Sequence, residues 1–137
     1  MSGADSPATL LAFDFGTRRI GVAVGQTISR TATPLALIPV RDGRIDWPAI
    51  AALVDEWRPA AIIVGLPVNM DGTRHALADR VERFARQLGG RYGREVKLID
   101  ERLSSVAAAE AASGAADTDA HAARVILESW LNDNDPH

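Results

Sequence analysis

The fold of this chain is decided near its N-terminus by the stretch LLAFDFGTRRIGVAV, Leu10–Val24. Its first part, Leu10–Phe15, is an apolar run that Asp14 interrupts, and Ile20–Val24 follows as a second run of strand character. Between them, Gly-Thr-Arg-Arg over 16–19 is short enough for a tight turn. Two such runs on either side of a tight turn predict an antiparallel hairpin.

The rest of the chain is predicted to alternate between strands and helices. Thr33–Val40 is expected to form an edge strand because it contains two prolines, and Ala60–Leu66 and Val96–Ile99 are expected to form two further strands. Helices are predicted from an N-cap at Asp46 to Pro59, from about Arg74 to Leu88 with a stop at Gly89-Gly90, from Ser104, and over Ala120–Leu131. A hairpin followed by alternating elements indicates an α/β fold with one mixed sheet and helices on both faces.

Composition sets limits on the classes of function. At 137 residues and 47% hydrophobic, the chain is expected to form one domain over 1–137, with an ordered core of about 9–132. It has no cysteine, which excludes disulfides and thiol catalysis. We find no signal peptide or membrane span in the sequence, so a cytoplasmic protein without a membrane partner is expected. The net charge of −3 argues only weakly against nucleic-acid binding, since a local basic patch can attract phosphate.

Three separated carboxylates are the candidate catalytic residues: Asp14, Glu101 and Asp119. The first two lie at predicted strand ends, and the third lies in the first turn of the last predicted helix. Each has a simpler alternative: Asp14 accepting hydrogen bonds from its turn, Glu101 pairing with Arg102, and Asp119 capping its helix. If they converge, they form the oxygen-rich pocket that Mg²⁺ prefers.

Candidate substrate-binding residues lie beside these acids. A small turn after Asp14 would let a phosphate approach the backbone, and arginine side chains pair well with phosphate oxygens. A Gly- and Pro-containing loop also follows the predicted strand Ala60–Leu66, where binding loops are common. The candidates are Gly16, Thr17, Arg18, Arg19, Asn69, Asp71, Gly72 and Arg102. The arginines at 80, 83 and 86 form a helical stripe, which is more often a solvated face than a nucleic-acid track.

Four segments in series resemble the motifs of the YqgF (RuvX) family of the ribonuclease H-like superfamily: LLAFDFGTRRIGVAV, IIVGLPVNMDGT, VKLIDERLSS and DAHAARVILESWL. The resemblance implies a ribonuclease H-like fold with a mixed five-stranded sheet in the order 3-2-1-4-5. It also implies an acidic site around Mg²⁺, with Mn²⁺ as the alternative metal. By position, Asp14 corresponds to the first-strand ligand, Glu101 to the acid of the DER motif and Asp119 to the acid of the last helix.

The activity implied by the resemblance is Mg²⁺-dependent hydrolysis of phosphodiester bonds in structured RNA. The expected role is maturation of the 5′ end of precursor 16S rRNA in ribosome biogenesis, with precursor rRNA or the pre-ribosome as partner. One alternative is a DNA endonuclease similar to Holliday-junction resolvases, which a homodimer with paired sites would favour. The other is a non-catalytic RNA-binding assembly factor. The absence of Lys and Arg between Arg102 and Arg124 favours this second alternative.

Overall fold

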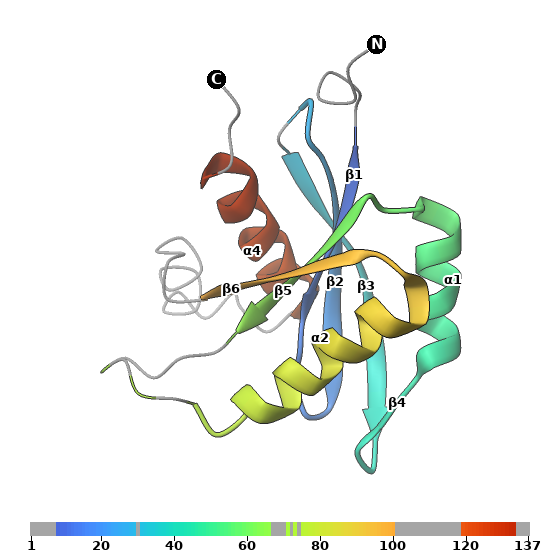
Figure 1. Cartoon of the computed structure of the whole chain (residues 1–137), viewed down its shortest axis with the longest axis vertical. Helices are drawn as coiled ribbons and strands as arrows, with labels where there is room; N and C mark the ends of the chain where they lie inside the picture. The colour runs from blue at the N-terminus through green and yellow to red at the C-terminus, as the bar shows by residue number, and fades with distance from the viewer. Residues whose placement is uncertain are drawn as a thin grey trace.

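A computed structural model describes residues 8–29, 31–66, 71, 73, 75–100 and 119–133, without the side chains at 100, 119–122, 132 and 133. The elements of this part of the chain are β1 (Thr9–Asp14), β2 (Arg19–Gln26), β3 (Thr31–Arg41), β4 (Arg44–Ile45), α1 (Trp47–Trp57), β5 (Ala61–Leu66), α2 (Ala78–Tyr92), β6 (Glu95–Asp100) and α4 (Asp119–Asp133). Figure 1 shows their arrangement around a central sheet. No helix in these ranges is long and apolar enough to cross a membrane.

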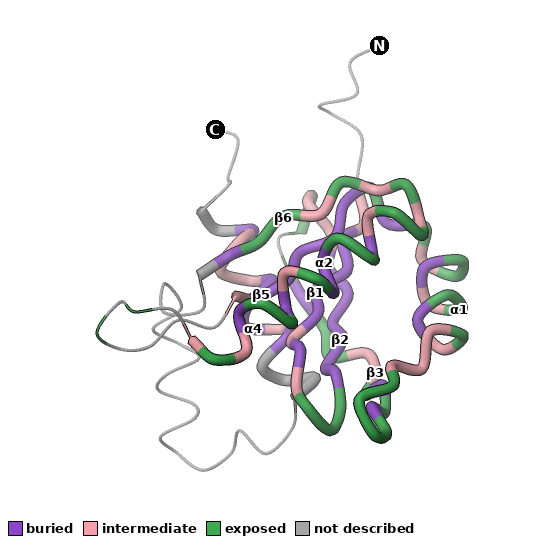
Figure 2. Tube along the Cα trace, turned by 60° about the horizontal axis from the view of Figure 1, so that its bottom comes forward, coloured by how far each residue is buried: buried purple, intermediate pink, exposed green. Residues whose placement is uncertain are grey.

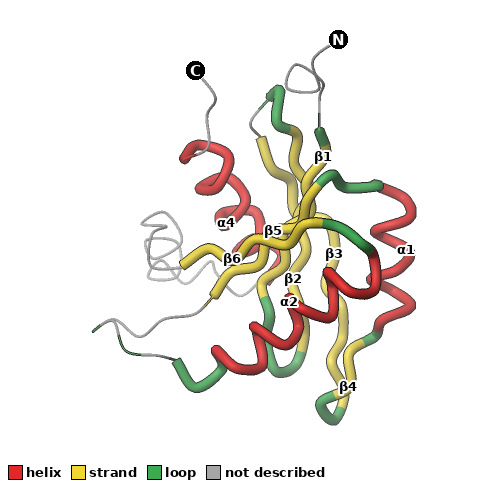
Figure 3. The backbone as a smooth tube through the Cα atoms, viewed as in Figure 1, coloured by secondary structure: helices red, strands yellow, loops and turns green. Residues whose placement is uncertain are grey.

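The strands form one mixed sheet in the order β4-β3-β2-β1-β5-β6 (Figure 3). β1, β2 and β3 are antiparallel neighbours, whereas β5 pairs in parallel with both β1 and β6. Without β4, this is the predicted 3-2-1-4-5 order, so the fold class is confirmed. β4 is a two-residue addition that pairs with the end of β3 through a turn in which Asp42 and Gly43 both have positive φ.

Side chains alternate along β1 between two differently covered faces. Leu11 and Phe13 lie in a core beneath α1 and α2, whereas Leu10 and Ala12 lie in a second core beneath α4. Figure 2 shows buried positions along the central strands and exposed positions on the outer turns of α1 and α2. The predicted helices on both faces of the sheet are therefore confirmed.

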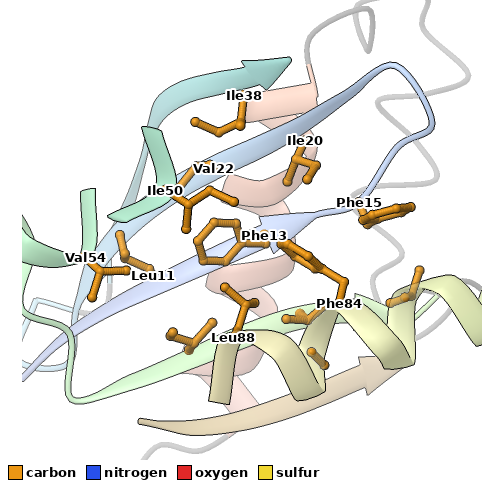
Figure 4. Packing of buried hydrophobic residues seen from close by; sticks show 14 of the residues in the cluster. Leu11, Phe13, Phe15, Ile20, Val22, Ile38, Ile50, Val54, Phe84 and Leu88 are labelled. Atoms are coloured by element: carbon orange, nitrogen blue, oxygen red, sulfur yellow. The ribbon is translucent and has the colours of Figure 1, made fainter. Parts of the chain in front are cut away.

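Aromatic packing dominates the α1/α2 face. The ring of Phe84 on α2 lies 5.7 Å from that of Phe13, 5.4 Å from that of Phe15 and 5.7 Å from that of Trp47. Figure 4 shows Phe13, Phe15 and Phe84 gathered near the end of β1. Such edge and tilted contacts add to the stability that comes from burial alone, and they attach the end of β1 to α2.

Small residues line the opposite face, where α4 packs. This second core contains Ala12, Ala23, Ala32, Ala61 and Ala123 together with larger aliphatic residues of α4 and the sheet. A Cβ atom at Gly25 of β2 would lie 2.8 Å from Cδ2 of Leu127 on α4 and 2.8 Å from the backbone oxygen of Thr31. Glycine at position 25 therefore allows α4 to approach the sheet closely.

Two predicted helix boundaries are corrected by the structure. α2 begins at Ala78 rather than near Arg74, and it continues through Gly89-Gly90 to Tyr92. The extra turn brings the ring of Tyr92 to 6.5 Å from that of Trp47. A Cβ on Gly90 would meet no atom within 4 Å, and a Cβ on Gly89 would make only ordinary contacts, at 3.6 Å from Cγ2 of Val96 and 3.7 Å from the backbone oxygen of Arg94. Gly93, at φ 63°, ends the helix in the left-handed region, and its N–H donates to the Gly89 carbonyl.

The other helix predictions have mixed outcomes. Asp46 caps α1 as predicted, because its side chain accepts a hydrogen bond of 3.2 Å from the backbone N–H of Ala49. The last helix is slightly longer than predicted, from Asp119 to Asp133. The alanine-rich helix predicted from Ser104 lies outside the described residues.

Candidate functional site

Asp14 is the last residue of β1, where it pairs with Gly21 of β2. It is half-buried, unlike the four residues before it, which are buried. Strand alternation places it on the α4 face with Leu10 and Ala12. The chain therefore presents a carboxylate at the end of a buried strand, where it is partly shielded and partly reachable from solvent.

The parallel strands β1, β5 and β6 end at the same edge of the sheet. Phe13 is paired with Val64 of β5, and Leu66 at the end of β5 is paired with Asp100 at the end of β6. The carboxyl ends of parallel strands are where α/β folds place their ligands. Glu101 follows β6 directly in the sequence but lies outside the described residues.

α4 begins near the level of Asp14. The helix runs opposite to β1, because it ends on the side of the sheet where β1 starts (Figure 1). Leu127 reaches Gly25, which is paired with Leu10 of β1. Asp119 precedes Leu127 by about 12 Å of helix, and Asp14 follows Leu10 by about 13 Å of strand. The backbone of Asp119 therefore lies toward the same end of the sheet as Asp14.

Of the three predicted metal ligands, only Asp14 has a described side chain. Within the described ranges, no three His, Asp or Glu residues lie close enough together to hold a metal ion. The convergence of the three carboxylates therefore stays a prediction, which the strand ends and the direction of α4 support at the level of the backbone.

The turn between β1 and β2 and the first residue of β2 carry four of the predicted substrate-binding residues. A Cβ at Gly16 would lie 2.5 Å from the backbone oxygen of Arg19, so the turn requires glycine there. Thr17, Arg18 and Arg19 are exposed. The backbone oxygen of Arg18 accepts a hydrogen bond of 2.8 Å from the N–H of Val40, which attaches the turn to β3. Two arginines are thus held at the surface within a few residues of Asp14.

The second predicted binding loop is described only in part. The Oδ1 atom of Asp71 accepts hydrogen bonds from the backbone N–H of Thr73 at 2.9 Å and from its hydroxyl at 2.7 Å. This local turn uses the carboxylate of Asp71 to shape the backbone. Asn69, Gly72 and Arg102 lie outside the described residues, so their predicted contacts with substrate stay predictions.

The structure also forms a hollow of about 420 Å³ on the α1/α2 face, which was not predicted. Its lining includes Phe15, Arg44, Trp47, Arg80, Arg83 and Phe84. The arginine stripe of α2 was recognised in the sequence, but its first two members turn out to face this hollow while Arg86 lines a different surface with Leu98. The hollow could not be foreseen because Arg44 comes from β4, the strand absent from the prediction.

Comparison with known families decides the classification of the chain. Residues 8–133 match the model of a family described as "RuvX: Holliday junction resolvase". The chain belongs to the RuvX family.

Two relatives match this RuvX chain over nearly their whole lengths. A protein of Hydrogenovibrio crunogenus is 48% identical over 124 residues, which cover 90% of this chain and 92% of the relative. A protein of Escherichia coli is 52% identical over 134 residues, which cover 90% of this chain and 95% of the relative. Both are named "Putative pre-16S rRNA nuclease".

Solved structures of two resolvases have folds similar to that of this RuvX chain. RuvC of Thermus thermophilus in complex with a Holliday junction substrate has a TM-score of 0.60 at 12% identity, covering 93% of this chain and 95% of RuvC. The fowlpox virus Holliday junction resolvase has a TM-score of 0.54 at 10% identity, covering 92% and 99%. At these identities the likeness shows the fold, which is that of RuvC-like resolvases.

Proposed function

We propose that this protein is a metal-dependent nuclease that hydrolyses phosphodiester bonds in structured RNA, at the 5′ end of precursor 16S rRNA. The observation that carries the proposal is the position of Asp14, half-buried at the sheet edge where β1, β5 and β6 end. The name of the two relatives at about half identity supports RNA as the substrate class.

The donor set fits a hard divalent cation, with Mg²⁺ as the proposed metal and Mn²⁺ as the alternative. Asp14 offers carboxylate oxygens, which such cations prefer, and Glu101 and Asp119 would complete the ligand set. Bound there, the cation would acidify an attacking water and stabilise charge on the leaving oxygen. The partial burial of Asp14 also suits this role, because a carboxylate shielded from water interacts more strongly with a cation.

The protein's own contribution is to hold the scissile phosphate beside Asp14. Arg18 and Arg19 are exposed in the adjoining turn, and a planar guanidinium can pair with two phosphate oxygens at once. The sharp bend at Gly16 and the hydrogen bond from Val40 to Arg18 restrict the backbone of this turn. A restrained turn orients the substrate without ordering a mobile loop on binding.

A second candidate function, cleavage of a DNA junction, is favoured by a separate observation. The matching family is described as a Holliday junction resolvase, and RuvC, which shares the fold, was solved with such a junction. The residues proposed for the site suit either nucleic acid, because they would contact phosphates and metal rather than base edges.

One experiment separates the two functions and tests catalysis itself. Precursor 16S rRNA and a DNA four-way junction would be incubated side by side with the protein, with and without Mg²⁺, using Asp14→Asn as the comparison. We expect Mg²⁺-dependent cleavage of the RNA by the wild type only. Cleavage of the junction alone would favour the resolvase, and binding without any cleavage would favour the assembly factor.

A further inference from the structure

We propose that the hollow between β4 and α2 binds an unpaired nucleotide of the RNA that flanks the cleavage point. This inference rests on the proposed nuclease function and adds a second contact on the opposite face of the sheet from Asp14. The hollow, about 420 Å³, falls within the size range of small-ligand sites.

Residues of β4, α1 and α2, together with the residue that follows β1, build the hollow. Phe15 follows β1, Arg44 lies in β4 and Trp47 begins α1, while Arg80 and Arg83 come from successive turns of α2. The Phe84 ring lies 5.4 Å from that of Phe15 and 5.7 Å from that of Trp47, so the aromatic wall is fixed by mutual packing. A preformed wall avoids much of the entropy cost of ordering side chains on binding.

The charge of the lining is of one sign. Arg44, Arg80 and Arg83 are exposed, and none of the described residues that line the hollow is Asp or Glu. Among the ion pairs of the described part of the chain, none involves these three arginines. The net charge of the whole chain is −3, so this cationic group is a local feature. A concave surface lined by one sign of charge concentrates ligands of the opposite sign.

The combination of aromatic rings and arginines indicates a nucleotide rather than a simple anion. The guanidinium carbon of Arg80 lies 5.7 Å from the centre of the Phe15 ring, which aligns a cation with an aromatic surface. Phe15 and Phe84 are buried, and the guanidinium carbon of Arg91 already lies 4.1 Å from the centre of the Trp47 ring. The flat groups that remain open to a base are therefore the guanidinium planes of the exposed arginines of the lining. Proteins stack unpaired bases on such arginine planes as well as on aromatic rings, and they pair arginines with phosphates. A paired base cannot enter such a hollow because its faces are already stacked in the helix.

The connection to the proposed active site is direct. Phe15 is the next residue after Asp14, and strand alternation sends the two side chains to opposite faces of the sheet. An RNA strand with its scissile phosphate at Asp14 can therefore continue around the sheet edge past the turn at 16–19 and reach the hollow. This path requires the flanking nucleotide to be free of a duplex.

The test is a binding assay in EDTA, so that RNA is not cleaved. The probes are a fluorescent RNA hairpin with single-stranded tails and the same hairpin with a blunt end, each titrated across a salt series. Arg80→Gln with Arg83→Gln is compared with Arg58→Gln with Arg86→Gln. The control pair removes the same charge from exposed sites that do not line the hollow.

We expect the Arg80/Arg83 variant to bind the tailed hairpin on the order of 10-fold more weakly. Its salt slope should fall by about 1.4, which is about 0.7 for each of two phosphates that the arginines no longer neutralise. Its affinity for the blunt hairpin should match that of the control variant. Equal affinities of the two variants for the tailed hairpin would overturn the inference, as would equal reductions in affinity for both hairpins. If the wild type bound neither RNA, the proposed function itself would fail first.

Discussion

The ring of Phe84 on α2 lies 5.4 Å from the ring of Phe15, the residue that directly follows the candidate catalytic Asp14. Phe84 is 1% exposed and also contacts Phe13 on the other side of Asp14 in the sequence. The acid is therefore flanked by two aromatic residues that are both packed against one helical side chain. This arrangement restricts the backbone of Asp14.

Replacement of the carboxylate at Asp14 tests the proposed metal site. Asp14→Asn keeps the size of the side chain but removes its charge, so cleavage of precursor rRNA should fall by on the order of 10²-fold or more. If Glu101 and Asp119 converge on Asp14 as predicted, stability without metal should hold or rise, because repulsion among the carboxylates is relieved. Initial cleavage rates and urea unfolding would be measured beside Asp55→Asn, a change at an exposed position of α1. Near-normal cleavage by Asp14→Asn would contradict the metal-site proposal.

The turn between β1 and β2 should contribute to RNA affinity through its two arginines. Replacing Arg18 and Arg19 together by Ala should weaken binding and flatten the dependence on salt by roughly one to two units. RNA affinity would be measured across a salt series for the wild type and this variant, with Arg58→Ala plus Arg86→Ala as the charge-matched control. Superimposable curves for the wild type and the turn variant would mean that substrate approaches from another face.

Two glycine substitutions should change stability in opposite directions. Gly25→Ala places a Cβ 2.8 Å from both Leu127 and the Thr31 backbone, and should lower the free energy of unfolding by about 1–3 kcal/mol. Gly90→Ala lies inside α2 with no atom within 4 Å of the new Cβ, and should raise that free energy by about 0.5–1 kcal/mol. Chemical denaturation measures both. A stabilising Gly25→Ala would show that α4 sits less closely on the sheet than described.

The protein should lose stability in alkaline solution through Tyr92. Burial raises the pKa of Tyr92 above its ordinary value of 10.0, and the positive charge of Arg91 offsets part of the rise. The unfolded chain therefore releases this proton at lower pH than the folded chain, so the contribution to stability is constant below about pH 10 and falls as the pH rises from there toward the folded pKa.

Tyr92 can be titrated alone, because it is the only tyrosine in the chain. Tyrosinate absorbance should show a higher midpoint in the folded protein than in urea. Arg91→Gln should raise the folded midpoint further, whereas Arg86→Gln, at an exposed site on another surface of α2, should leave it unchanged. Equal midpoints in the folded and unfolded chains would contradict this account.

Most of the fold could be predicted because the decisive signals are local. The hairpin of β1 and β2 follows from two apolar runs and a short turn, and the buried stripe of α2 follows from helical spacing at Val81, Phe84 and Leu88. On the side away from β2, β3 pairs with β4 only at Val40 and Arg41. The two prolines of β3, which lack an N–H, are therefore compatible with this strand.

The errors arose where tertiary contacts override local preference. Gly89-Gly90 normally favours a helix end, but the packing of Tyr92 near Trp47 carries α2 one turn further. β4 has only two residues, too few to leave a periodic pattern in the sequence. The hollow depends on β4, α1 and α2 together and therefore has no signature in any one segment.

The sequence predicted which residues form the candidate site, but it did not predict how they are arranged in space. Asp14 could be singled out because a carboxylate at the end of an apolar strand is unusual. Spacing along the chain does not predict whether the carboxylates of Glu101 and Asp119 approach Asp14, because their positions depend on the segment between β6 and α4. The backbone positions of β6 and α4 show only that both approach the same edge of the sheet.

The core beneath α4, with its five alanines, predicts which helix separates from the sheet most easily. The core beneath α4 combines five alanines with leucine and isoleucine, whereas the core beneath α1 and α2 contains three buried phenylalanines and one alanine. Aromatic rings remove more apolar surface from water than alanines do, and stabilisation scales with that area. Separating α4 from the sheet should therefore cost less free energy than separating α2 from it. Such an opening would be sub-global, because the aromatic core beneath α2 would stay packed. In native-state hydrogen exchange, amides of α4 should lose protection before those of α2. The helix that carries Asp119 would then be able to leave and re-engage without the protein unfolding.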